Sequence, residues 1–393
     1  MRRIAANYIF TVEGAALKNG IVELDDNGKI LKVEDTNGKL KESSKLEFYN
    51  GIITPGFINT HCHIELSELK DKIPQGKGLP EFINKIFEYR NENTLENNDK
   101  AIDLQNSLMR NAGIVAVADI SNTNASINVK RSSSIYYHTF CEVAGTKSNP
   151  DKIFNSLQEL FNEFVNQDLS ASIVPHAPYS VSSGLFNRIY EFAEKENSIL
   201  SIHNQETESE NQMFLNKTGT LVDTLEDLGV DLSNYKPAGS NSLESITKLL
   251  PRNNNIIFVH NTYSEYEDVR MASEYFKNSY WCLCPLSNLY IENKLPDLNI
   301  FKEFSNKVTL GTDSLASNTT LSIMEEMKVI SNNSDISFSE LLKWATINGA
   351  KALKLDNKFG SIKEGKTPGL NLVTDFDFEN MCLAEKSKVK VLV

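Results

Sequence analysis

The sequence predicts an α/β protein, in which a (β/α)8 TIM barrel lies beside a small β-sandwich built from both ends of the chain. Three observations predict this fold. Short apolar runs alternate with longer amphipathic stretches through the middle of the chain, which is typical of βα units and a parallel sheet. Both ends instead carry short β-type runs separated by turn residues. The 393 residues can hold a barrel, which usually takes about 250 residues, and a second small unit.

Composition places the chain among ordinary globular proteins. It has 40% hydrophobic and 23% charged residues and a formal net charge of -12, and its lysines and arginines are scattered, unlike those of a nucleic-acid binder. No apolar run approaches the roughly 20 residues of a membrane-spanning helix. The basic start, Met1 to Phe10, is too short in its apolar part for a secretory signal. We therefore expect a cytoplasmic protein with a small-molecule substrate and with neither nucleic acid nor membrane as a partner.

The five cysteines do not indicate a disulfide framework, because their number is odd and most lie far apart. Cys282 and Cys284 would share one face of a strand, but no second cysteine pair is present to complete a thiolate metal site. We interpret both as small buried apolar residues.

The predicted elements divide the chain into three parts. Residues 1–53 form the first part of the sandwich, with β runs at 21–24 and 29–33 around an Asp-Asp-Asn-Gly turn. Residues 54–354 form the barrel, and residues 355–393 complete the sandwich with runs at 370–373 and 388–393. We expect this C-terminal part to pair with the N-terminal β unit.

Eight apolar runs supply the barrel strands, and the segments between them supply helices. Two of these segments, 153–164 and 185–194, repeat apolar residues at steps of three and four, as amphipathic helices do. The eight predicted strands are 52–60, 114–120, 135–141, 171–175, 199–202, 256–259, 280–284 and 308–310.

The six histidines are concentrated where a barrel carries its chemistry. Five of them, His61, His63, His176, His203 and His260, fall at the end of a predicted strand, whereas His138 lies inside one. A single histidine is more often a surface or packing residue than a ligand. In a barrel, however, the carboxyl ends of all strands meet at one mouth, where active sites lie. We assign His138 to packing or to support of the site.

A metal site follows from the residues at this mouth. His61 and His63 are separated by one residue, so strand alternation places both imidazoles on one side. His203 could add a third nitrogen and Asp313, after the eighth strand, a carboxylate oxygen. Three nitrogens, one oxygen and an open position for water describe a catalytic zinc or iron site better than a closed structural one.

With these motifs in place, the chain resembles the amidohydrolase superfamily, in its deaminase and chlorohydrolase branch. The resemblance runs from about Asn7 to the C-terminus. It rests on four motifs in order, namely TPGFINTHCH at 54–63, HNQE at 203–206, VHN at 259–261 and GTDS at 311–314.

The resemblance implies a role for each matching residue. His61, His63, His203 and Asp313 would bind one divalent metal, zinc foremost, with iron or manganese as alternatives. Glu206 would be the proton shuttle, and His260 would orient or polarise the water on the metal. Binuclear members carry a modified lysine at strand four, which this chain lacks, so a mononuclear site is expected. Glu142 remains open as a bridging carboxylate. A homodimer is expected only by analogy with the family.

Three further segments resemble substrate-contacting loops of the branch. His176, in HAPYSVS, matches the strand-four segment of S-adenosylhomocysteine and methylthioadenosine deaminases, although a histidine that only braces a loop would look the same. Ser287 and Asn288 belong to a CPLSN loop that shapes the mouth or simply forms a turn. Glu65, in HCHIELS, is similar to aminodeoxyfutalosine deaminases and could bind ribose, but an acidic residue at this place is often only a first-turn charge. Residues 70–90 are either a mobile lid or a surface excursion.

These observations predict a metal-dependent hydrolase that deaminates an amino-substituted heteroaromatic ring. The substrates that the resemblance favours are adenine nucleoside derivatives: aminodeoxyfutalosine, S-adenosylhomocysteine, methylthioadenosine and adenosine. A chlorohydrolase or a cyclic-amide hydrolase with the same metal site is the alternative, and a barrel that has lost catalysis and serves as a binding protein is a third.

Overall fold

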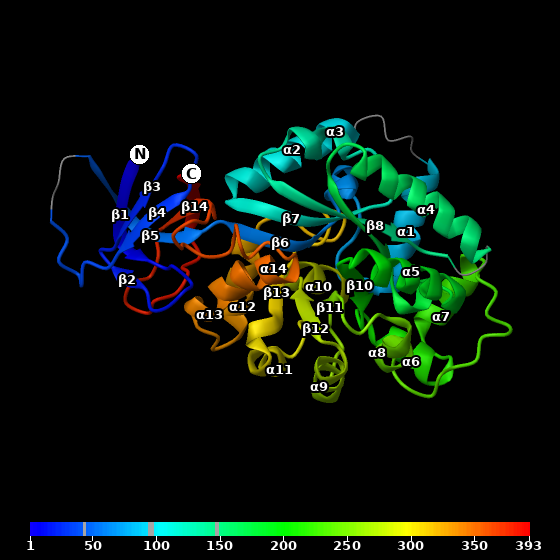
Figure 1. The fold of residues 1–393 in the computed structure, drawn as a ribbon. Helices are drawn as coiled ribbons and strands as arrows, with labels where there is room; N and C mark the ends of the chain where they lie inside the picture. Colours follow the sequence, from blue (N-terminus) through cyan, green and yellow to red (C-terminus); the bar gives the residue numbers. More distant parts are fainter. Residues whose placement is uncertain (42–44, 93–97, 146–148) are drawn as a thin grey trace.

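The computed structural model describes residues 1–41, 45–92, 98–145 and 149–393. Its strands lie in three sheets, one of seven strands and two of four. Figure 1 shows the seven-stranded sheet at one end, with the first and last parts of the chain side by side, and the parallel strands with most helices at the other. Within the described ranges, no helix is both long enough and apolar enough to cross a membrane. All five cysteines are free.

Both ends of the chain build the seven-stranded sheet, as predicted. Its strands follow the order β15-β14-β5-β1-β3-β4, with β2 added on β1. The long strand β5 pairs in parallel with β1 on one edge and antiparallel with β14 on the other. Its strands are β1 (Arg2–Ile9), β2 (Leu17–Lys18), β3 (Ile21–Leu24), β4 (Ile30–Glu34), β5 (Leu46–Pro55), β14 (Leu370–Thr374) and β15 (Lys388–Val391).

The small β unit from both chain ends is built on one mixed sheet. Because β5 holds N-terminal and C-terminal strands on its two edges, all seven belong to this sheet. A cluster of apolar side chains from both chain ends packs on it and includes Ile4, Val22, Ile53 and Leu370. The structure thus agrees with the predicted shared β unit, and the pairing of its described strands gives one sheet.

The eight predicted barrel strands are all present, and all run in parallel. They form two four-stranded sheets of consecutive strands, β6-β7-β8-β9 and β10-β11-β12-β13. The strands are β6 (Phe57–Cys62), β7 (Ile114–Ser121), β8 (Tyr136–Val143), β9 (Ser170–Pro175), β10 (Leu200–Asn204), β11 (Asn255–His260), β12 (Asn278–Leu283) and β13 (Val308–Leu310).

The two parallel sheets touch at both of their edges without a continuous ladder. Between β6 and β13, Cys62 and Asp313 form one isolated parallel bridge, and the Thr60 hydroxyl donates to the Leu310 carbonyl at 2.9 Å. Between β9 and β10, the His203 amide donates to the His176 carbonyl at 2.9 Å. The pairing of the described strands is therefore divided between two sheets in contact, where the predicted barrel would have one continuous ladder.

Helices follow the strands, as βα units require. The predicted helix at 153–164 lies within α4, where Pro150 takes the first position and the Asn149 side chain accepts from the Asp151 amide. The α-helices are α1 (Gly78–Glu92), α2 (Asn98–Asn111), α3 (Ile127–Ser132), α4 (Pro150–Val165), α5 (Ser183–Glu196), α6 (Glu208–Asn216), α7 (Thr220–Asp227), α8 (Ser242–Ile246), α9 (Tyr266–Tyr275), α10 (Pro285–Glu292), α11 (Leu298–Glu303), α12 (Ile323–Asn333), α13 (Phe338–Trp344) and α14 (Ile347–Ala352). Short 3₁₀ turns are η1 (Ile64–Leu69), η2 (Pro178–Ser180), η3 (Thr247–Leu249) and η4 (Ser305–Lys307).

The sequence run 52–60, predicted as one strand, is divided between two sheets. Strand β5 ends at Pro55 in the terminal sheet and β6 begins at Phe57, with only Gly56 between them. Residues that carry chemistry at the end of β6 are thus joined directly to the terminal sheet.

Candidate metal centre

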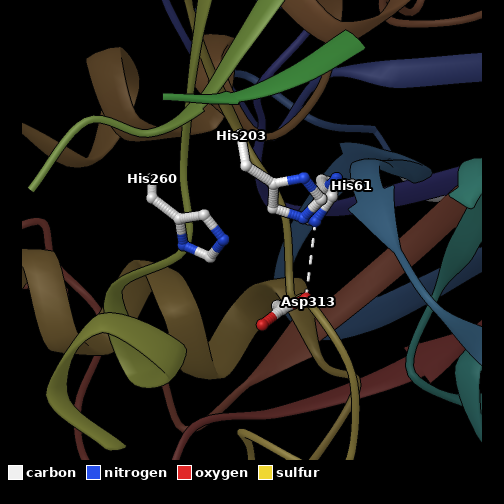
Figure 2. A group of neighbouring side chains, drawn as sticks. All are labelled: His61, His203, His260 and Asp313. Atoms are coloured by element: carbon white, nitrogen blue, oxygen red, sulfur yellow. Dashed lines mark ion pairs between the residues drawn. The ribbon is translucent and has the colours of Figure 1, made fainter. Parts of the chain in front are cut away.

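The carboxyl ends of the parallel strands bring four ligand-type side chains together. Figure 2 shows His61 from β6, His203 from β10, His260 from β11 and Asp313 after β13 pointing toward one another. One ligand atom from each lies within 4.8 Å of the others. Parallel strands end at the same edge, which is why residues 252 positions apart in the chain, such as His61 and Asp313, become neighbours.

His63 joins the same group. Its Nε2 lies 3.1 Å from His61 Nε2, and each of these two nitrogens lies 3.4 Å from Asp313 Oδ1. The structure therefore brings together all four residues predicted as metal ligands, and it places His260 among them as well.

Two of the imidazoles are oriented by a hydrogen bond at the nitrogen that faces away from the centre. His203 Nδ1 lies 2.8 Å from the His176 carbonyl oxygen, which can only accept. His260 Nδ1 lies 2.9 Å from Asn288 Oδ1. With the proton on Nδ1, each ring leaves Nε2 with a bare lone pair, and such outward bonds are the usual means of orienting metal-binding histidines.

Burial favours the neutral form of the two histidines of the HCH motif. It lowers the pKa of His61 and of His63 to about 3, far below the ordinary value of 6.5. Their Nε2 atoms lie 3.1 Å apart and each lies 3.4 Å from Asp313 Oδ1, so the three atoms can bind one ion between them. This donor set fits a divalent metal ion.

Asp313 supplies the negative charge of the centre. Burial acts to raise its pKa, but the hydrogen bond with His61 and the neighbouring His63 and His260 outweigh burial and hold the pKa well below the usual range. Ser287 Oγ donates to Asp313 Oδ2 at 2.7 Å, and Ser317 Oγ donates to the same oxygen. An ionised carboxylate with two hydroxyl donors behind it can present its other oxygen, Oδ1, to a cation.

Glu206 differs from Asp313 in the direction of its pKa shift. It follows β10, its side chain is buried, and its Oε1 lies 3.6 Å from His260 Nε2. Burial raises its pKa well above the ordinary value of 4.5. Two neighbouring carboxyl groups whose pKa values shift in opposite directions are the pairing that acid and base catalysis needs.

The turn that carries Glu206 is held by a second buried acid. Glu210 accepts the backbone amides of Gln205 and Glu206 at 3.1 and 3.2 Å, one on each carboxylate oxygen. Gln205 itself has a φ of 46°, a left-handed conformation that needs such support. Glu210 was not among the predicted site residues. The signal in the sequence was an acidic residue four positions after Glu206, the last residue of the HNQE motif.

A cavity of about 520 Å³ opens over the centre. The strand ends form its polar side, with His63, Glu142, His203, Glu206, His260 and Asp313, and apolar residues of α1 and α7 form the opposite wall. His176 lines this cavity, and its Nδ1 lies 2.7 Å from Ser180 Oγ.

The other three predicted substrate residues face the protein instead. Ser287 is fully buried behind Asp313, and Asn288 accepts from His260. The Glu65 carboxylate accepts from the Asn122 and Thr123 amides and from the Thr123 and Ser126 hydroxyls, at 3.0 to 3.2 Å. None of the three lines the cavity in the described part of the chain, so the geometry favours positioning roles over the predicted substrate contacts.

Sequence reasoning missed a buried ion pair under the HCH motif. Lys130 Nζ lies 2.7 Å from Asp119 Oδ2, both side chains are fully buried, and Asp119 Oδ1 accepts the Ile64 amide at 2.8 Å. The pair thereby fixes the chain where it leaves His63. The acidic residue near the end of the second predicted strand was a signal, but nothing in the sequence indicated that Lys130 would be its partner.

The comparisons with known proteins agree with this geometry. The model described as Amidohydrolase family matches residues 52–391, and the chain belongs to that family. The adenosine deaminase of Helicobacter pylori is 27% identical over 352 residues, covering 88% of this chain and 84% of that protein. The aminodeoxyfutalosine deaminase of a Nitratiruptor species is 26% identical, covering 82% and 79%.

Solved structures give the same result. The crystal structure of Helicobacter pylori aminofutalosine deaminase with methylthio-coformycin matches with a TM-score of 0.82 and 26% identity, covering 95% of this chain and 92% of that one. A zinc-bound adenosine deaminase from Xanthomonas campestris matches with a TM-score of 0.74 at 21% identity, covering 96% and 85%, which supports the fold alone.

Proposed function

We propose that this member of the amidohydrolase family is a metal-dependent deaminase that hydrolyses the amino group from a heteroaromatic ring, with an adenine nucleoside derivative as substrate. The observation that carries the proposal is the meeting of Asp313, the strand-end histidines and Glu206 at one cavity. Relatives named as deaminases of adenosine, aminodeoxyfutalosine, and methylthioadenosine with S-adenosylhomocysteine support the substrate class.

His61, His63, His203 and Asp313 would hold one divalent ion. The donor set of three imidazole nitrogens and one carboxylate favours zinc, with iron and manganese as the alternatives. When bound, such an ion lowers the pKa of a water molecule and so makes it a nucleophile at neutral pH.

Glu206 and Asp313 divide the proton transfers between them. Burial raises the pKa of Glu206, which favours its acid form, so it can donate to the ring nitrogen next to the carbon under attack and thereby make that carbon more electrophilic. Asp313 begins ionised and can accept the proton that the attacking water loses. A proton returned to the departing amino group then releases ammonia, and the ring keeps a carbonyl in its place.

His260 and His176 position the reactants in this account. His260 is fixed through Nδ1 by Asn288, so its Nε2 is directed toward Glu206 and the metal ligands. His176 lies on the cavity wall beside His203, with ring centroids 4.7 Å apart, where a ribose or ring edge can reach it.

We extend the proposal to the scaffold. Residues 54–354 would form the barrel unit that carries the metal, and residues 1–53 and 355–393 the terminal β unit. In this view, the isolated Cys62–Asp313 bridge closes the barrel at the place where two metal ligands, His61 and Asp313, must be held together.

The proposal is tested by ammonia release from zinc-reconstituted protein. The substrates are adenosine, methylthioadenosine, S-adenosylhomocysteine, aminodeoxyfutalosine, guanine and cytosine, and the ultraviolet shift from amino-purine to hydroxy-purine is followed in parallel. We expect turnover of at least one adenine nucleoside. Silence across the panel with metal bound would overturn the deaminase proposal and move the assignment to chloride loss or cyclic-amide opening.

A further inference from the structure

We infer that the cavity selects nucleosides whose ribose C5′ carries a neutral apolar group and rejects those with a carboxylate there. This inference rests on the proposed function and narrows its substrate class. It is drawn from the wall of the cavity that faces away from the metal centre.

One part of that wall is an apolar stripe of α1. Leu79, Phe82, Ile83, Ile86 and Phe87 recur at helical steps and all line the cavity. The core covers only part of the stripe, because Leu79 is buried, the next three are half-buried, and Phe87 is 47% exposed. The segment 70–90, predicted as a lid or a surface excursion, thus ends in a helix whose apolar face is left for a ligand to cover.

The second part of the wall comes from α7 and the turn after it. Leu225 is buried, while Leu228 and Val230 are half-buried, and all three line the cavity. Together, α1 and α7 give an apolar surface opposite the polar strand ends.

The acidic groups of the cavity lie on its polar side. They are the carboxyl groups of Glu142, Glu206 and Asp313. Among the described residues that line the cavity, none is a lysine or an arginine. A carboxylate moved from water to an apolar wall without a cationic partner loses hydration that nothing replaces.

The orientation of a substrate follows from the reaction. The amino-bearing carbon must lie at Glu206 and Asp313, which places the base at the strand ends. The group on C5′ is the part of the nucleoside farthest from that carbon, so it meets the α1 and α7 wall. A methylthio or similar apolar group would bury its surface there.

The test compares two substrates that differ at one place. 5′-Methylthioadenosine and 5′-(carboxymethyl)thioadenosine share base, ribose and sulfur, and only the second carries a carboxylate. We expect kcat/KM for the first to be higher by at least about ten-fold, mainly through KM. Equal values, or a preference for the carboxylate or for aminodeoxyfutalosine, which also carries one, would overturn the inference.

Introducing a cation at the wall gives a second readout. In Leu228→Arg and in Ile86→Arg, a guanidinium can reach the C5′ group, so the preference for the neutral substrate should fall by at least about ten-fold. Leu215→Arg on α6 is the matched control, since Leu215 is 52% exposed and does not line the cavity. An unchanged preference in both wall variants, with their melting temperatures intact, would contradict the assignment of this wall.

The failure of this inference can be distinguished from failure of the proposed function. If no nucleoside releases ammonia, the proposed function falls, and calorimetric binding of the same two ligands decides the inference separately. Tighter binding of the neutral ligand would support it, and equal or weaker binding would overturn it.

Discussion

Asp313 is the residue on which most of the site depends. Its amide donates to the His61 carbonyl at 3.0 Å, its Oδ1 lies near His61 and His63, and its Oδ2 is held by Ser287 and Ser317. It also has a φ of 57°, so the backbone turns sharply to direct this side chain inward. One carboxylate thus connects the metal ligands, the base and the β6–β13 edge.

Asp313→Asn should reduce kcat/KM by at least about 100-fold and weaken metal binding, since an amide is neither a base nor an anionic ligand. Steady-state kinetics and metal analysis of the same preparation check this. Asp335→Asn, at an exposed carboxylate paired with Lys302, is the control and should behave as the wild type. Near-normal turnover of the Asp313 variant would exclude Asp313 as base and ligand.

Glu206→Gln should retain the metal and lose deamination by at least about 100-fold, because the amide cannot pass a proton to the ring. Glu206 is placed beside the ligands but is assigned no metal bond, so metal content separates the two roles. A variant that lost its metal would show that Glu206 is a ligand and that the shuttle lies elsewhere.

His138 should make stability depend on pH in the acid range. It lies inside β8, its two ring nitrogens lie 2.8 and 2.9 Å from the Ser170 and Ser172 hydroxyls, and burial lowers its pKa to about 3 from 6.5. Between these values the unfolded chain binds a proton that the folded chain does not. The neutral, buried His138 therefore contributes fully to the free energy of unfolding above pH 6.5. This contribution is lost as the pH falls toward 3, by about 1.4 kcal/mol for each pH unit.

Urea unfolding of the wild type and His138→Gln at several pH values between 4 and 8 measures this contribution. The variant should lose less stability than the wild type as the pH falls. Parallel curves for the two proteins would mean that His138 is protonated in the fold.

At the residue scale, chemistry-bearing side chains could be predicted, and their hydrogen-bond partners could not. The ends of the parallel strands can be predicted from the sequence, and in a barrel they converge. The candidate ligands could therefore be recognised; they are His61, His63, His203 and Asp313. Substrate contact stays a prediction for Ser287, Asn288 and Glu65. Their side chains bond to the protein in this structure, and a sequence does not reveal which way a side chain at the mouth turns.

At the scale of elements, the parallel strands were the most predictable part of the molecule. The fully buried strand β11 reads as a continuous apolar run bounded by Asn255 and His260. The start of β5 at Leu46 was missed, since its first residues are partly exposed and mixed in character. The lid prediction for residues 70–90 stays a prediction about motion, whereas the helix α1 within that segment is observed.

The contact between β7 and α3 should be sensitive to removal of one charge. Lys130→Met leaves Asp119 buried without its partner and should destabilise the protein by about 3–5 kcal/mol. The double variant Asp119→Asn/Lys130→Met removes both charges but keeps a side-chain oxygen that can accept the Ile64 amide, so it should recover most of that loss. Urea unfolding measures both, and equal destabilisation of the two variants would contradict an ion-pair origin.

At the scale of the whole molecule, Gly56 joins the terminal sheet to the strand that carries the HCH motif. A Cβ at this position would lie 2.2 Å from Val115 Cγ1 and 2.8 Å from the Pro368 carbonyl oxygen. Gly56→Ala should therefore cost about 1–3 kcal/mol and reduce metal affinity, because β6 must shift.

Gly14→Ala is the matched control for this change, since a Cβ there meets nothing within 4 Å. Its melting temperature and metal affinity should equal those of the wild type. If Gly56→Ala were as harmless as the control, the terminal sheet and β6 would not be coupled through this junction.

The number of parallel strands and their order along the chain were predicted correctly. That both ends share one β unit followed from their similar composition. Which strands pair with the two edges of β5 could not be predicted, because alternation patterns do not encode which edge a strand uses. The contact between the two parallel sheets could not be predicted either. It consists of isolated bridges and hydrogen bonds, and the apolar runs of the sequence do not indicate these.

The central claim, hydrolytic removal of a ring amino group by this site, is tested most directly with oxygen-18 water. Zinc-reconstituted protein is incubated with methylthioadenosine in oxygen-18 water. The mass of the product is determined by mass spectrometry, and the released ammonia is quantified. We predict one oxygen-18 atom in the ring and one ammonia per turnover, with both absent in Glu206→Gln at equal metal content. Unlabelled product, no ammonia, or an active Glu206→Gln would contradict the claim.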